Sequence, residues 1–126
     1  MRYTLKKETK PTLKTFGKYK AVACHPETID THRIVKELCS QESISEGAVY
    51  NVLIALSEVV SRHLRRGDNV RLDRWGLMKL EIESGTVDSP ADFDPREHIR
   101  GLRLHFLPES RKGKPELYQG VEFVED

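Results

Sequence analysis

Cysteine, aromatic side chains and long apolar runs are all scarce in this chain of 126 residues. Its two cysteines, Cys24 and Cys39, are too few for the disulfide framework that stabilises small secreted domains. Cys24 and His25 are neighbours, but no second pair follows at a zinc-like spacing, so we expect no metal site. No apolar run approaches the roughly 20 residues that a membrane span needs. The N-terminal sequence MRYTLKKETK lacks the apolar segment of a signal peptide, and we expect a cytoplasmic protein without a membrane partner.

Excess charge of one sign is also lacking, because the formal net charge is only +1. That value alone argues against a nucleic-acid-binding protein. The charges are unevenly placed, however: residues 1–20 hold seven Lys or Arg against one Glu, and residues 99–115 hold five against one. Blocks of positive charge of this kind can bind phosphate groups. We expect a basic N-terminal arm over residues 1–17 and one folded domain over residues 18–126.

The spacing of apolar residues predicts two helices. The first begins near Thr28 or Asp30, either of which can cap it, and runs to about Cys39. The second begins after Ser45 and ends at Gly67. Its apolar stripe is wider than one neighbouring helix covers, so a second copy of the chain is a natural source of cover. The stripe consists of Ala48, Val49, Val52, Leu53, Leu56, Val59, Val60 and Leu64.

Alternation of apolar and polar residues predicts strands on both sides of the helices. We expect strands at residues 3–5, 18–23, 69–72, 78–82 and 102–106, the last three forming a meander. Residues 84–98 contain Gly, Pro and four acids, and are predicted to be a loop or an irregular hairpin tip. After Pro108 the pattern weakens, with a short helix within residues 110–118 and a final strand near residues 121–124.

This order of elements resembles the HU/IHF family of histone-like, DNA-bending dimers. The resemblance runs from about Thr28 to Ser110, and the N-terminal strand segment is similar to the extension of HU-like proteins from Bacteroidetes. It implies an α+β fold with a helix pair, a three-stranded antiparallel sheet with an arm, edge strands from the N-terminal extension, and an intertwined dimer. The matching features are the apolar second helix, its Leu64–Gly67 exit, Val70 and Leu72, the Trp75-Gly76 turn, the strand with Met78 and Leu80, and Phe106.

The same resemblance implies a function. In this family the dimer binds double-stranded DNA, and its arms enter the minor groove and wedge a proline between base pairs. We therefore predict largely sequence-tolerant DNA binding by a nucleoid-associated homodimer, with no cofactor and no small-molecule substrate. The expected DNA-contacting side chains are Arg71, Arg74, Lys79, Arg100, Arg103, His105, Arg111, Lys112 and Lys114.

The stretch that corresponds to the family's arm departs from the family pattern. Residues 84–98 have a net charge of −3, and their prolines, Pro90 and Pro95, are not part of an Arg-Asn-Pro tip. Phosphate groups repel an acidic tip. The alternative function is therefore an HU-like dimeric protein-interaction or structural module that has lost DNA bending.

Two other activities have weaker support. Tyr3, Phe16 and Tyr19 are interleaved with lysines and would allow bases of single-stranded nucleic acid to stack on them. An enzyme is not predicted, because no histidine is spaced to act with a nucleophile or a metal. The histidines are scattered along the chain, at His25, His32, His63, His98 and His105.

Overall fold

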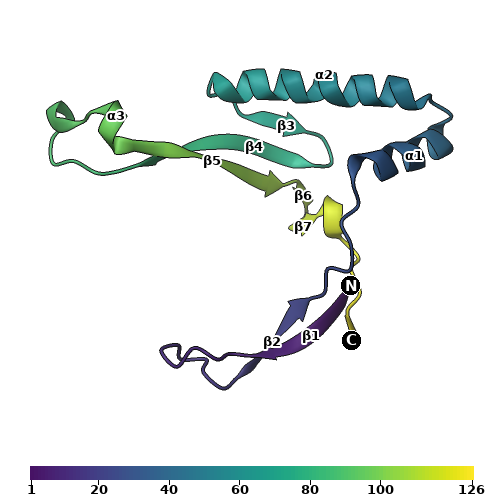
Figure 1. Ribbon diagram of the computed structural model, residues 1–126, viewed down its shortest axis with the longest axis horizontal. Helices are drawn as coiled ribbons and strands as arrows, with labels where there is room; N and C mark the ends of the chain where they lie inside the picture. Colours follow the sequence, from purple (N-terminus) through teal and green to yellow (C-terminus); the bar gives the residue numbers. More distant parts are fainter.

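The computed structural model describes all of residues 1–126 and contains the two predicted helices, which contact each other (Figure 1). Helix α1 spans Thr31–Glu42, and the Asp30 side chain before it accepts a hydrogen bond from a first-turn amide. Helix α2 spans Glu46–Arg65 and is capped in the same way by Ser45. Gly67 follows α2 with φ of +91°, a left-handed conformation that ends many helices. The predicted second helix, with its Ser45 cap and Gly67 end, is confirmed, and Asp30 proves to be the cap of the first.

Three strands form an antiparallel meander, here called the meander sheet: β3 (Val70–Leu72), β4 (Gly76–Ser84) and β5 (Ile99–Pro108). Met78 pairs with both Val70 and Phe106, so most apolar residues of the three strands share one face. Helix α2 packs against β3 and β4 on this face. The opposite face is polar except for Leu77 and Leu107, which pair with each other near Arg71. The three-stranded sheet expected from alternation is confirmed.

The arm between β4 and β5 is more ordered than the predicted loop. It contains a short 3-10 helix, η1 (Pro90–Asp92), and a one-turn helix, α3 (Pro95–His98). The side chains of Ser89 and Asp94 accept hydrogen bonds from the first amides of these turns. Such short turns depend on caps and prolines rather than on apolar periodicity, and the periodicity of the sequence therefore does not reveal them.

The chain after β5 forms a second, much smaller hairpin from β6 (Ser110–Arg111) and β7 (Lys114–Pro115). Its two turn residues, Lys112 and Gly113, have φ of +52° and +76°, as in the type I′ turns that favour tight hairpins. The short helix expected within residues 110–118 is reduced to a 3-10 turn, η2 (Glu116–Tyr118), because the hairpin occupies the rest.

The N-terminal extension forms a sheet of its own, here called the terminal sheet. Strand β1 (Arg2–Lys7) pairs antiparallel with β2 (Tyr19–Ala23) and parallel with β8 (Val124–Glu125), near the C-terminus. The expected strands are confirmed, but the expectation that they add edges to the meander is wrong, because they pair only with one another. Alternation of apolar and polar residues predicts that a strand forms. It does not predict which other strand pairs with it, because that depends on which segments the tertiary structure brings side by side. Figure 1 shows the terminal sheet on the side of the meander sheet away from α2.

The chain buries almost none of its side chains by itself. Only Val35, Val49 and Gly76 are buried. The solvent-accessible surface is 10942 Å², whereas a folded monomer of 14.5 kDa exposes about 6,900 Å². Apolar side chains on α2 and on the outer half of the meander sheet remain open, among them Val52 (65% exposed) and Leu102 (62% exposed). None of the helices is both long and apolar enough to cross a bilayer.

Gly76 begins β4 at a point where no side chain fits. Its φ is +149°, and a Cβ there would lie 2.1 Å from the carbonyl oxygen of Leu107. We expect Gly76→Ala to lower the free energy of unfolding by about 3 kcal/mol or more, because backbone strain and a backbone clash act together. Urea denaturation followed by circular dichroism measures this change. Gly47→Ala, near the start of α2 with no atom within 4 Å, is the control and should be neutral or stabilise by up to about 1 kcal/mol; equal losses in the two variants would contradict the argument.

Candidate nucleic-acid interface

Glu81 lies at the centre of the polar face of the meander sheet. Arg103, directly opposite on β5, donates a hydrogen bond to its Oε2 atom at 2.8 Å. The Nζ atom of Lys79 and the Nδ1 atom of His105 each lie 3.8 Å from Oε1. The strand register therefore brings three of the predicted DNA-contacting residues together around one carboxylate.

The hydrogen bond from Arg103 is the main reason why the pKa of Glu81 lies below its ordinary value of 4.5, and nearby positive charges lower it further. The same hydrogen bond raises the pKa of Arg103. Glu81 is consequently ionised at neutral pH. The cluster then holds the full positive charges of Lys79 and Arg103 against one negative charge, so part of its attraction for an anion is neutralised internally.

A second carboxylate, Glu109, joins the turn after β3 to the end of β5. Its side chain is only 12% exposed, and it accepts hydrogen bonds from the Arg71 guanidinium and from the backbone amide of Arg74. These hydrogen bonds, of which the one from Arg71 has the largest effect, hold the pKa of Glu109 below 4.5. The same bond raises the pKa of Arg71. Arg74 takes a left-handed φ of +71° at this turn. Arg71 thus has a structural partner, while the Arg74 guanidinium is left free.

The remaining predicted residues lie at the two ends of β5. Arg111 on β6 pairs at 2.7 Å with Glu116, the first residue of η2, while Lys112 lies in the β6–β7 turn and Lys114 lies on β7 opposite Arg111. Arg100 is the extra residue of a β-bulge, because Ser84 and Glu83 pair with the residues on either side of it. Arg74, Arg100, Lys112 and Lys114 have no carboxylate partner.

The glutamate partners were missed in the sequence analysis. Alternation places Glu81 on the same face as Lys79 and Arg103, so this partner could have been inferred. Glu109 could not, because 38 residues separate it from Arg71 and no local pattern links the two.

The tip of the arm carries no counterpart of the family's basic wedge. The ring of Phe93 stacks on His98 with centroids 5.4 Å apart, and the carboxylate of Asp94 accepts a hydrogen bond from the backbone amide of Arg96. Phe93 remains 38% exposed. The tip is therefore a small, closed, acidic structure with one accessible aromatic ring.

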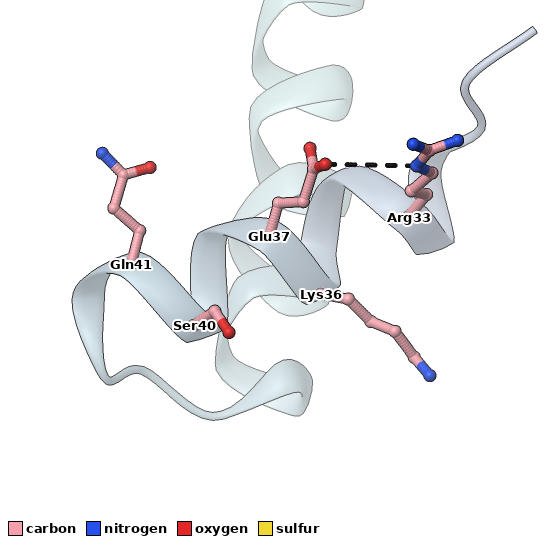
Figure 2. Close-up of a pocket in the computed structure, with 5 residues that line it drawn as sticks. All are labelled: Arg33, Lys36, Glu37, Ser40 and Gln41. Carbon is pink, nitrogen blue, oxygen red and sulfur yellow. Dashed lines mark ion pairs between the residues drawn. The ribbon is translucent and has the colours of Figure 1, made fainter.

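Figure 2 shows a hollow on the outer face of α1 that contains none of the predicted residues. Its lining consists of Arg33, Lys36, Glu37, Ser40 and Gln41. Arg33 contacts Glu37 at 4.0 Å. One helix supplies the whole lining and no side chain in it is apolar, so the hollow lacks the enclosure of a small-molecule site.

The hydrogen bonds on Glu109 predict a pH dependence. Because its pKa is lower in the folded than in the unfolded chain, their contribution to stability is present above about pH 4.5 and is lost as pH falls through the folded-state pKa. We expect a carbon-13 NMR titration of the Glu109 carboxyl group to have its midpoint below 4.5. Arg71→Gln should move that midpoint upward, toward 4.5, whereas Arg96→Gln at the arm tip should leave it in place. A midpoint that Arg71→Gln does not change would contradict the assigned role of Arg71.

Comparison with known proteins places this geometry in a family. A model of the HU domain fused to a wHTH, Ig or glycine-rich motif matches residues 1–116. The fold is similar to the 2.25 Å crystal structure of a candidate bacterial DNA-binding protein from Bacteroides vulgatus ATCC 8482, with a TM-score of 0.64 and 12% sequence identity. The alignment covers 99% of this chain and 47% of the solved one, so the chain spans about half of that protein. No curated protein matches the chain in sequence.

The solved structure, at 12% identity, supports the fold, while the family model covers most of the sequence. The resemblance to HU proteins inferred from the helix pair and the Trp75-Gly76 turn is thereby confirmed. The chain belongs to the family of HU domains fused to wHTH, Ig or glycine-rich motifs.

Proposed function

We propose that the protein binds double-stranded DNA with little sequence preference, as a nucleoid-associated architectural homodimer. The observation that carries this proposal is the cluster of Lys79, Arg103 and His105 on the polar face of an HU-type meander sheet. Long cationic side chains on a sheet meet phosphates rather than base edges, which gives affinity without a preferred sequence. The solved neighbour, presented as a candidate DNA-binding protein, is consistent with this function.

The homodimer is supported by the exposed apolar surface. A groove between α1 and α2 is lined by Glu42 and six apolar residues, Leu38, Ile44, Ala48, Val49, Val52 and Leu53, and nothing in the chain covers it. The surface of each chain exceeds that of a folded monomer of this mass by roughly 4,000 Å², which is more than its half-share of an obligate dimer interface, where both partners together bury about 2,000–5,000 Å². A second copy would cover the groove and the outer half of the apolar sheet face together.

A second candidate function, a dimeric protein-interaction module, is supported by the arm. Residues 84–98 have a net charge of −3 and carry the accessible ring of Phe93. Such a surface suits a basic protein better than a phosphate backbone. Co-purification from native lysate separates the two functions: partners that persist after nuclease treatment favour the module, and partners that are lost favour DNA.

The DNA-binding proposal predicts that removing Glu81 strengthens binding. Glu81→Gln would release Arg103, Lys79 and His105, so we expect severalfold tighter binding to a labelled 35-base-pair duplex. The slope of log K against log salt should steepen by about 0.9 for each released cation that reaches a phosphate. Fluorescence anisotropy across a salt series measures both quantities.

Glu58→Gln is the matched control for this experiment. It removes the same charge from α2 at a position nine residues, or two and a half turns, beyond Val49 and therefore opposite the apolar stripe. We expect it to bind as the unchanged protein does. Failure of the folded protein to retain duplex at low salt would overturn the DNA-binding proposal and leave the interaction module.

The dimer predicts a specific sensitivity on α2. Val52→Glu would place a charge in the apolar groove, so we expect loss of the dimer and a lower urea midpoint. The neighbouring substitution Asn51→Glu introduces the same group on the polar side of the helix and should preserve the dimer. Sedimentation velocity distinguishes the two masses. A wild-type protein that sediments at 14.5 kDa and still unfolds cooperatively would exclude the proposed homodimer.

A further inference from the structure

The terminal sheet has two chemically different faces. In the β1–β2 register, residues directly opposite each other share a face. One face is largely apolar and consists of Tyr3, Leu5, Tyr19, Ala21 and Ala23, with Lys7 at its distal end. The other is basic at its distal end and consists of Thr4, Val22, Lys6 and Lys20. Lys18 extends the basic face by alternation, since its carbonyl oxygen accepts a hydrogen bond from the Glu8 amide and continues the ladder.

The basic face brings three lysines together against one acid, because alternation also places Glu8 on it, opposite Lys18. Lys6 lies directly opposite Lys20, and like charges at such positions destabilise a sheet. Glu8 is the one acid of the hairpin, and its carboxylate accepts a hydrogen bond from the Lys10 backbone amide at 3.0 Å. The face is therefore net positive, and an anion that approaches it lowers the free energy of the sheet.

The lysines of this hairpin differ from the cations of the meander sheet in one respect. All six are exposed, and none forms an ion pair: Lys6, Lys7, Lys10, Lys14, Lys18 and Lys20. On the meander sheet and its ends, by contrast, carboxylates already hold five of the nine predicted cations, Arg71, Lys79, Arg103, His105 and Arg111, and leave Arg74, Arg100, Lys112 and Lys114 unpaired. A paired cation must give up its carboxylate before it contacts phosphate in full, whereas an unpaired lysine needs only to lose water and counterions.

The position of the hairpin suits a ligand that also lies along the meander sheet. Helix α2 packs on the apolar face of that sheet, so the Glu81 cluster faces the other way. The terminal sheet lies on this other side (Figure 1). An extended polyanion on the polar face of the meander would therefore run on the same side of the molecule as the unpaired lysines.

We propose that the hairpin of residues 2–23 is a second binding site for duplex DNA, in which Lys6, Lys18 and Lys20 contact backbone phosphates. The choice of DNA as the ligand rests on the proposed function, while the site itself rests on the unpaired charge and the strand register. Contacts of this kind carry no sequence information and depend steeply on salt.

The test is the triple variant Lys6→Gln/Lys18→Gln/Lys20→Gln in the full chain, titrated against the same 35-base-pair duplex across salt. We expect the slope of log K against log salt to become shallower by about 2 to 3 for each protomer whose hairpin contacts the duplex, from about 0.9 per phosphate contact. The dissociation constant at low salt should rise at least tenfold. Removal of the Lys6–Lys20 repulsion should leave thermal stability unchanged or higher, so weaker binding cannot be attributed to unfolding.

Two further proteins make the result decisive. Lys36→Gln/Arg62→Gln/Arg65→Gln removes three unpaired charges from the outer sides of α1 and α2, and should change the slope by less than 1. Lys6→Arg/Lys18→Arg/Lys20→Arg retains the charge and should bind as the wild type does. If the glutamine triple variant matches the helix control while Glu81→Gln still strengthens binding, the hairpin site is overturned and the proposed function stands.

The remaining outcomes also decide the question. A wild-type protein that fails to bind duplex at low salt overturns the hairpin site together with the proposed function. A triple variant that keeps its duplex affinity but loses affinity for a single-stranded RNA of equal length would overturn duplex DNA as the ligand of the hairpin.

Discussion

The structure depends on apolar surface that the chain cannot cover alone. Its local elements are well defined by caps, turns and backbone pairing, yet only Val35, Val49 and Gly76 are buried. The stabilisation that a domain of this size normally draws from a core must then come from contact with another surface. The same constraint orients the sheet, because α2 packs on its apolar face and, in our proposal, a second copy of the chain covers the rest of that face. The polar face is thereby left open to solvent and available for an anion.

Positive charge occurs in two different arrangements. On the meander sheet, Glu81 and Glu109 hold arginine side chains in defined positions, which reduces the freedom of those side chains but also neutralises part of their charge. In the terminal hairpin the lysines are mobile point charges without partners, and the register places Lys6 beside Lys20. The first arrangement favours a fixed orientation, and the second favours strong, salt-dependent attraction. The near-zero net charge of the whole chain conceals this division.

The arm departs from the pattern that the HU/IHF resemblance implies, because it is acidic and lacks an Arg-Asn-Pro tip. Capped turns at Ser89 and Asp94 close the tip on itself, and Phe93 stacks on His98. Phosphate would be repelled by the acids gathered here. In our proposal, contact with DNA therefore shifts from the arm tip to the polar face of the meander and to the terminal hairpin.

The sequence by itself determined the local structure. The caps at Asp30 and Ser45, the left-handed Gly67 and the alternation of the meander strands all follow from interactions within a few residues. It also determined which residues share a face, since a strand alternates with period two. Tertiary structure alone decided which strands and charges meet: β8 pairs with β1 across nearly the whole chain, and Arg71 meets Glu109 across 38 residues. Such partners depend on how the backbone brings distant segments together. Local periodicity predicts strands and their faces, but it does not predict contacts between residues that are far apart in the sequence.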